Sequence, residues 1–100
     1  MSYEIVWSYD VDADDREAFE RAYGPEGEWA QLFSRGAGFV ELVLLADAAA
    51  PGRYLTIDRW RDQASFEQFM VQESDGYAAL DDALAGVSRR GTRLGGFVRR

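Results

Sequence analysis

A short segment with strand-like alternation carries the side chains best suited to chemistry. Residues 53–60, RYLTIDRW, place Tyr54, Thr56, Asp58 and Trp60 on one face of a strand, because successive side chains of a strand point to opposite faces. Asp58 can act as a general base, and burial of such a polar group is costly without a hydrogen-bond partner or water. The face therefore lines either a small-molecule pocket beside helices or the interface with a second chain.

The composition restricts the proton transfer that this segment can perform. The 100 residues include no histidine and no cysteine, so imidazole bases, thiolate nucleophiles, disulfides and the usual haem and zinc ligands are missing. Proton transfer must then fall to carboxylates, tyrosines, arginine-assisted water or the substrate. We predict no metal and no cofactor. Three roles stay open for Asp58, namely an ion pair with an arginine, a general base or a surface position, and Arg59 is expected to be a structural ion-pair partner.

Charge and hydropathy argue against two classes of partner. The formal net charge of −7 argues against nucleic acid, whose phosphates need a basic face. No apolar run approaches the ~20 residues that span a membrane, and the N-terminus lacks a basic region followed by an apolar one, which predicts a cytoplasmic location. Acidic residues concentrate in 10–28 and arginines in 89–100, so we expect these segments to attract each other. Every basic residue is arginine, which indicates a GC-rich bacterial genome.

The apolar periodicity predicts one domain, 1–100, with the order strand, helix, strand, strand, helix, strand. Period-two alternation or a short apolar run predicts strands at 3–11, at 38–46, at 53–60 and within 89–100. Helical spacing predicts helices within 12–24, within 25–36, from 62 onward and at 75–86.

Local residue types predict where these elements begin and end. Asp14 and Asp62 are expected to cap helices, and Gly86 is expected to end the segment that begins at Asp75. The pair Gly95-Gly96 predicts a bulge in the last strand.

This order predicts the α+β class, with a ferredoxin-like βαββαβ fold in which helices cover one face of a four-stranded antiparallel sheet. The run at 38–46 is almost continuously apolar, which predicts a strand that is buried on both faces. A chain of this length has no further element to cover the second face. We therefore expect a homodimer whose two sheets pack face to face.

Several stretches together resemble one known family. The segments AYGPEGEWAQLF, GFVELVLLAD, GRYLTIDRW, SFEQF and LGGF are similar to the antibiotic biosynthesis monooxygenase domain of the dimeric α+β barrel group, over nearly the whole chain. The resemblance implies a pocket between the sheet and the helices of each subunit. In oxygenases of this group an aromatic, polyketide-like substrate reacts there with oxygen without flavin or a dedicated metal. The Trp that ends the third strand of the family matches Trp60.

The haem-degrading branch of the group also uses a His in the helix after that strand and an Asn on the first strand. This chain has Phe69 and Met70 at the first place and Trp7 and Ser8 at the second, and it contains no His or Asn at all. Haem oxygenation of that kind is therefore not expected.

The function predicted from these features is cofactor-independent monooxygenation of a small hydrophobic aromatic, quinone-like molecule. The protein would desolvate and orient the substrate while Asp58 removes a proton and Tyr77 or Tyr54 donates a hydrogen bond to the developing oxyanion. The predicted catalytic residues are Asp58, Trp60 and Tyr77. The predicted substrate-binding residues are Trp7, Tyr54, Thr56, Phe66 and Phe69. The alternatives are a non-catalytic dimer that binds a hydrophobic metabolite and a scaffold subunit with a filled core.

Overall fold

The computed structural model describes residues 1–88 and 90–100. Its strands are β1 (Tyr3–Asp10), β2 (Phe39–Ala46), β3 (Arg53–Trp60) and β4 (Gly91–Val98). Its helices are η1 (Ala13–Asp15), α1 (Arg16–Tyr23), α2 (Glu28–Phe33), α3 (Gln63–Gln72), α4 (Ser74–Ala83) and α5 (Ala85–Ser88).

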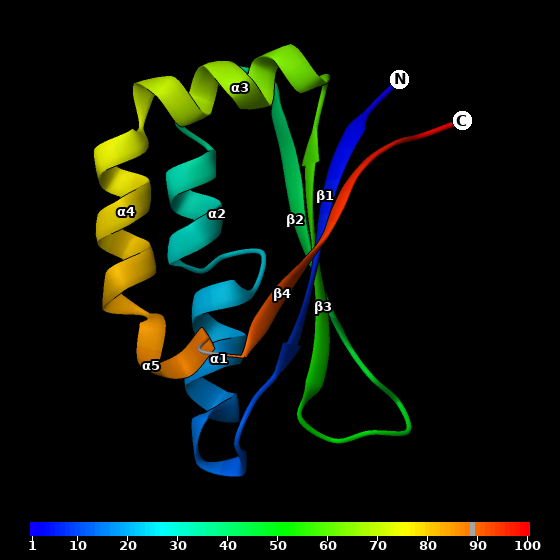
Figure 1. Ribbon diagram of the computed structural model, residues 1–100, viewed down its shortest axis with the longest axis vertical. Helices are drawn as coiled ribbons and strands as arrows, with labels where there is room; N and C mark the ends of the chain where they lie inside the picture. The colour runs from blue at the N-terminus through cyan, green and yellow to red at the C-terminus, as the bar shows by residue number, and fades with distance from the viewer. Residues whose placement is uncertain (89) are drawn as a thin grey trace.

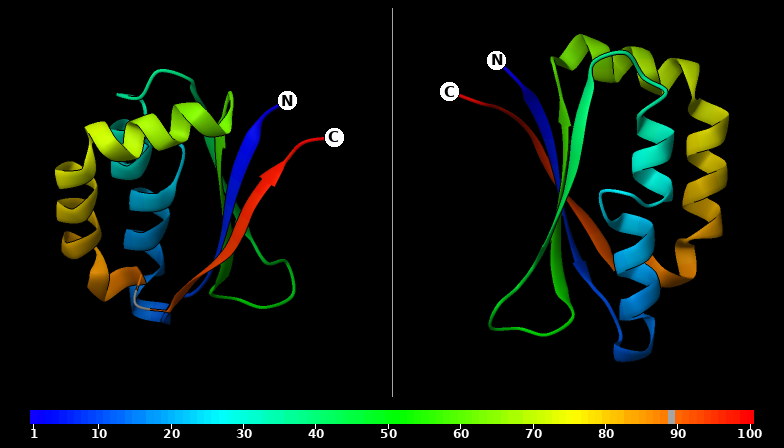
Figure 2. Two further views of the ribbon diagram at one scale, coloured as in Figure 1. Left: turned by 45° about the horizontal axis from the view of Figure 1, so that its top comes forward. Right: turned by 180° about the vertical axis from the view of Figure 1, so that it is seen from behind.

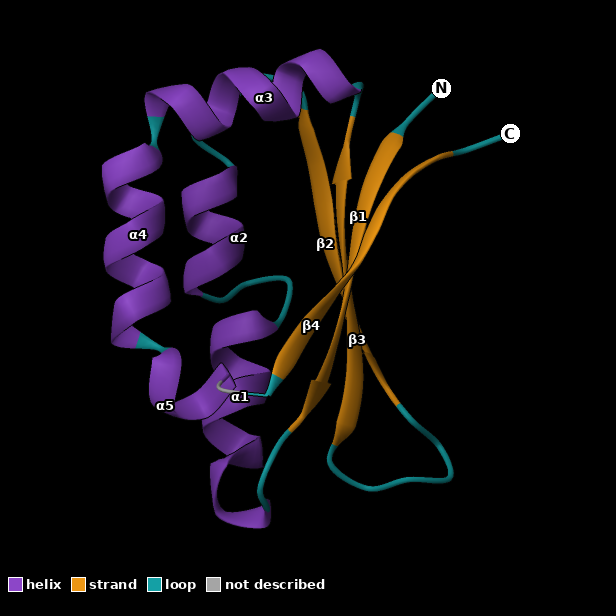
Figure 3. Ribbon diagram, in the orientation of Figure 1, coloured by secondary structure: helices purple, strands orange, loops and turns teal. Residues whose placement is uncertain are grey.

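The strands form one antiparallel sheet in the order β2-β3-β1-β4, as expected for a ferredoxin-like fold. All the described helices lie on the same side of the sheet, and the described residues place no helix on the opposite side (Figures 1 and 2). The arrangement is an α+β fold of two layers, which Figure 3 separates by colour. The predicted fold class and element order are confirmed.

The side-chain alternation of β3 sets the orientation of the candidate residues. Tyr54, Thr56, Asp58 and Trp60 are all buried on the helix side, whereas Leu55, Ile57 and Arg59 alternate with them on the other face. Of the two orientations that the sequence left open, the structure shows the one that directs this face to the helices. The alternative, in which Asp58 and Trp60 face a second chain, is wrong.

Strand β2 has one open face in the single chain. It is an edge strand, and only Leu42 of its residues is buried, while Val40 and Leu45 are 54% and 47% exposed. The single chain therefore leaves one face of β2 open, as expected for a chain with no further element to cover it, and burial of that face by a second copy stays a prediction. The physical reason is the layer order: helices cover one face of the sheet, so an apolar run exposes its other face unless a further chain covers it.

The predicted helix boundaries are met in part. The Asp62 side chain caps α3 by accepting a hydrogen bond from the Ser65 N–H at 2.8 Å. Asp14 is not a helix cap, since it lies inside η1, and α1 begins directly after η1, at Arg16, without a side-chain cap. Gly86 ends no helix, because the chain continues through it into α5.

The last strand contains the expected irregularity. Along β1, Val6 is paired with Gly95 but the next residue, Trp7, is paired with Arg93, so one residue of β4 is extra. Gly95 has a φ of +150°, which a side chain would disfavour. A bulge in this strand is confirmed, but its extra residue is Leu94, one position before the predicted Gly95-Gly96 pair.

The uncovered sheet face combines apolar side chains with an ion-pair network. Arg59 Nε donates to Glu4 Oε1 at 3.2 Å and its Nη1 to Glu41, and Arg99 Nε donates to the other Glu4 oxygen at 3.0 Å. The Arg99 guanidinium, with help from Arg59, lowers the pKa of Glu4 to about 2. The predicted structural role of Arg59 is confirmed.

The charge-separated segments meet as expected, since Arg90 forms an ion pair with Asp12. No helix among the described residues is long and apolar enough to cross a membrane.

Candidate functional site

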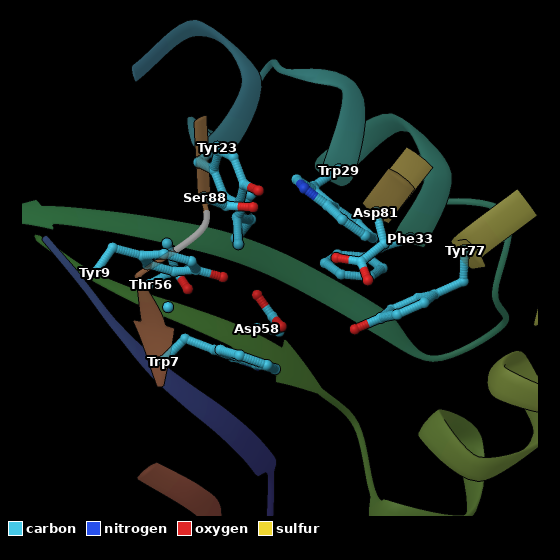
Figure 4. Close-up of a pocket in the computed structure, with 12 residues that line it drawn as sticks. Trp7, Tyr9, Tyr23, Trp29, Phe33, Thr56, Asp58, Tyr77, Asp81 and Ser88 are labelled. Atoms are coloured by element: carbon cyan, nitrogen blue, oxygen red, sulfur yellow. The ribbon is translucent and has the colours of Figure 1, made fainter. Parts of the chain in front are cut away.

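A hollow lies between the sheet and the helices, lined by residues of all four strands, β1 to β4, on one side and by α1, α2, α4 and α5 on the other (Figure 4). Its cavity volume is about 70 Å³. Aromatic and acidic side chains dominate its wall, which consists of Trp7, Tyr9, Tyr23, Trp29, Phe33, Leu42, Thr56, Asp58, Tyr77, Asp81, Ser88 and Gly91.

Asp58 projects from β3 into this hollow, as Figure 4 shows. Asp58 is 8% exposed. Its carboxyl group forms no hydrogen bond or ion pair with any described residue. Burial raises its pKa from 3.8 to about 7, and the more distant charge of Arg93 opposes the rise. The ion pair considered for Asp58 is therefore not formed with any arginine that the structure describes, and the carboxyl group changes protonation state near neutral pH.

Tyr77 comes from α4 and directs its hydroxyl toward Asp58 from the other side of the hollow (Figure 4). Burial raises its pKa to about 12, and the nearby Asp58 and Asp81 add to the rise. A phenol with this pKa keeps its proton at neutral pH. Tyr77 can therefore donate a hydrogen bond, while Asp58 can accept a proton.

Trp7 and Thr56 also line the hollow, as predicted for substrate-binding residues. Trp7 stacks on Tyr9 with ring centroids 5.9 Å apart and an interplanar angle of 16°. Trp7 is only half-buried, whereas Thr56 is buried at the floor beside Asp58. Four of the predicted site residues are thus brought together, namely Trp7, Thr56, Asp58 and Tyr77.

Trp60, Phe66, Phe69 and Tyr54 do not line the hollow. Trp60 is fully buried in a neighbouring aromatic cluster, where its ring contacts four phenylalanines, Phe33, Phe39, Phe66 and Phe69, with centroid distances of 5.1–5.9 Å. The Tyr54 hydroxyl donates instead to Glu20. The structure therefore places these four residues in the core around the hollow.

Other lining residues were not predicted as site residues from the sequence, notably Tyr9, Tyr23, Trp29, Asp81 and Ser88. The helical spacing of Tyr23 and Trp29 indicates only that their faces are buried. Trp29 Nε1 carries a more specific feature, because it is buried and has no hydrogen-bond partner within residues 1–88 and 90–100. Such a donor beside a hollow marks a place for an acceptor atom, but it becomes visible only once the fold is known.

The hollow is smaller than the ~300 Å³ typical of small-molecule sites. A volume of about 70 Å³ is equivalent to about two water molecules. A ring system can therefore enter only when rim side chains move outward, and the half-buried Trp7 and Tyr77 are placed to do so. Within the described part of the chain, no group of three or more His, Cys, Asp or Glu side chains is placed to hold a metal ion.

Comparison with known proteins gives a consistent result. The family model "Antibiotic biosynthesis monooxygenase" matches residues 2–79. A mutant form of SnoaB, a cofactor-independent oxygenase from Streptomyces nogalater, is 25% identical, with a TM-score of 0.73 over 99% of this chain and 93% of its own. No curated protein matches the sequence significantly.

Two further solved structures share the fold at lower identity. The monooxygenase ActVA-Orf6 of Streptomyces coelicolor, solved with the ligand nanaomycin D, is 14% identical, with a TM-score of 0.72 over 99% of this chain and 88% of its own. A conserved protein of Methanosarcina mazei is 12% identical, with a TM-score of 0.72 over 100% of this chain and 94% of its own.

Proposed function

Because the chain belongs to the antibiotic biosynthesis monooxygenase family, we propose that it is a cofactor-independent monooxygenase that oxidises a small aromatic, quinone-forming substrate in the hollow beneath its helices. The similarity to SnoaB, which is a cofactor-independent oxygenase, supports the reaction class. The single observation that carries the proposal is Asp58, a buried carboxyl group that projects into the hollow, forms no ion pair with any described residue and has a pKa of about 7.

The proposed reaction starts with proton transfer to Asp58. A methylene group beside an aromatic carbonyl, or the phenol conjugated to it, loses a proton to the carboxylate and leaves an electron-rich carbanion or phenolate. Tyr77 donates a hydrogen bond to the oxygen on which the negative charge accumulates. The surrounding aromatic rings exclude water and hold the substrate plane.

The electrons for the oxidation come from the substrate itself. The carbanion transfers electrons to dioxygen and forms a C–O bond at the same carbon. Loss of the second hydrogen and cleavage of the O–O bond then leave a carbonyl group. In sum, a CH₂ group and O₂ become a C=O group and water, so no external reductant enters the balance.

Turnover should follow the protonation of Asp58. The base is active when ionised, so kcat/KM should rise with pH and level off above about 7. The test is oxygen consumption with 9-anthrone over pH 5 to 9, corrected for the spontaneous rate. Asp58→Asn should lower kcat by at least about 100-fold. The matched control is Asp82→Asn, which changes an exposed carboxylate on α4 and should leave the rate unchanged.

Equal enzyme-dependent rates in the wild type and Asp58→Asn would refute this assignment of the base. Tight binding of the anthrone without any oxygen consumption would favour the alternative of a binding protein.

We propose in addition that the protein acts as a homodimer through the uncovered face of its sheet. On that face Leu45 pairs with Leu55 and is 47% exposed, and Phe97 pairs with Glu4 and is 52% exposed. Together with Ile57 they form an apolar area on the side that no helix covers (Figure 2). A second copy of the same face would bury this area and would satisfy the expectation that both faces of β2 are covered.

A further inference from the structure

Two buried tryptophan nitrogens have no hydrogen-bond partner among the described residues, Trp29 Nε1 and Trp60 Nε1. Their surroundings differ. Trp60 is enclosed by phenylalanine rings, where no polar group could enter, whereas Trp29 forms part of the wall of the hollow. A buried donor without an acceptor is energetically unfavourable. Of the two, only the Trp29 N–H can regain a hydrogen bond from a molecule that binds in the hollow.

The atoms around Trp29 Nε1 form a polar corner on the helix side. Figure 4 shows this nitrogen directed toward the hydroxyl groups of Tyr23 and Ser88, which come from α1 and α5. Burial raises the pKa of Tyr23, and the Ser88 and Trp29 donor groups directed at its oxygen partly offset that rise, although the Trp29 N–H does not reach hydrogen-bonding geometry. The Ser88 hydroxyl already donates to the Leu84 carbonyl oxygen at 3.1 Å. The corner therefore offers an indole N–H and a tyrosine O–H as donors.

Asp58 lies across the hollow from this corner, on the sheet side (Figure 4). The two walls have opposite chemistry, since one accepts a proton and the other donates hydrogen bonds. A ligand that spans the hollow would meet both walls only if it carried an acceptor oxygen at one end and a removable proton at the other.

We propose that Trp29 and Tyr23 form a binding subsite for a carbonyl or phenolate oxygen of the substrate, while Asp58 faces its acidic C–H or O–H group. The inference rests on the proposed function and narrows its substrate class to conjugated ketones and phenols. As the proton leaves, part of the negative charge moves through the conjugated system onto this oxygen, so the Trp29 and Tyr23 hydrogen bonds strengthen and add to the one from Tyr77. The neutral indole cannot itself titrate in this range, which makes it a donor at every working pH.

The test uses two probes with the same carbon skeleton, 1-tetralone, which has a carbonyl oxygen, and tetralin, which has none. Dissociation constants are measured by NMR titration of the full chain, with the indole N–H resonances assigned through Trp29→Phe and Trp60→Phe. In the wild type we expect 1-tetralone to bind about tenfold more tightly than tetralin. Its binding should move the Trp29 N–H resonance downfield and leave the hydrogen bonding of the Trp60 N–H unchanged.

Trp29→Phe should remove the preference for 1-tetralone while keeping the affinity for tetralin. Trp60→Phe is the matched control, because it removes an equally unpartnered N–H outside the hollow, and it should keep the preference. Tyr23→Phe should reduce the preference in part, and it serves as the second variant if Trp29→Phe does not fold.

Equal affinity of the wild type for both probes would overturn the inference, and would mean that water alone satisfies the donor. A preference that survives in Trp29→Phe would overturn it as well. These binding measurements involve no turnover, so their outcome does not depend on whether the proposed reaction occurs. If Asp58→Asn loses oxygen consumption but the wild type shows no preference for 1-tetralone, the proposed reaction is supported and the subsite is not. If the wild type prefers 1-tetralone but Asp58→Asn keeps its oxygen consumption, the subsite is supported and the proposed reaction is not.

Discussion

Replacement of Asp58 by Asn should stabilise the protein at neutral and alkaline pH. In the folded chain burial raises the pKa of this carboxyl group to about 7 from its ordinary 3.8. Below about pH 4 both the folded and the unfolded chain keep the proton, and Asp58 carries no penalty. As the pH rises toward 7, the unfolded chain releases the proton and the folded chain retains it, so the free energy of unfolding falls.

The magnitude follows from the pKa difference. About three pH units at ~1.4 kcal/mol each correspond to a loss of roughly 4 kcal/mol, complete above about pH 7. Asparagine has nearly the same shape and does not titrate. The difference between Asp58→Asn and the wild type should therefore grow from pH 4 to about pH 7 and stay constant at higher pH, up to this size.

Urea unfolding followed by tryptophan fluorescence, at several pH values between 4 and 8.5, measures this difference. Comparison of the two proteins at each pH cancels the titration of every other group, including Glu4. Asp82→Asn, an exposed substitution of the same kind, should give a curve parallel to that of the wild type. A pH-independent difference between Asp58→Asn and the wild type would refute the reasoning, because it would mean that the buried carboxyl group has an ordinary pKa.

Three other substitutions test the core, the sheet face and a close backbone contact. Trp60→Phe should lower the free energy of unfolding by roughly 1–3 kcal/mol in urea titrations without loss of turnover, since Trp60 is fully buried outside the hollow; lost turnover at unchanged stability would instead support its predicted catalytic role. Phe97→Glu should convert the proposed dimer to a monomer, because it places a charge beside Glu4 on the exposed apolar face. Light scattering at micromolar concentration measures this change, and a wild type that is itself monomeric would contradict the dimer. Gly27→Ala should destabilise the chain by about 1–3 kcal/mol in thermal unfolding, because a Cβ would overlap the carbonyl oxygens of Arg21 and Ala22. An unchanged melting temperature would show instead that the start of α2 can shift freely.

The sequence was sufficient to predict the sheet and the orientation of β3. The alternation of Tyr54, Thr56, Asp58 and Trp60 assigns them to one face, and the burial of all four confirms it. Burial of β2 was harder to predict, because an apolar run reports that a strand avoids water but not which molecule covers it. The position of a strand at the sheet edge depends on the whole topology.

The candidate site was predicted in part, and the reason lies in the geometry of a strand. Residues two apart on one face of a strand are about 7 Å from each other. One residue can therefore line a hollow while the next residue on the same face lies in a packed core. Asp58 therefore lines the hollow, whereas Trp60, on the same face, is surrounded by aromatic rings. Helical periodicity has a similar limit, since it marks Trp29 as buried but does not show that its nitrogen borders an open space.

The bulge in β4 has an electrostatic consequence. In a regular ladder Leu94 would stand opposite Trp7, and Arg93 would be turned to the uncovered side of the sheet. The extra residue instead brings Arg93 opposite Trp7, where its positive charge acts on Asp58 and restrains the upward movement of its pKa. A single inserted backbone position thus adjusts the acidity of the proposed base toward neutrality, without any direct contact between the two side chains.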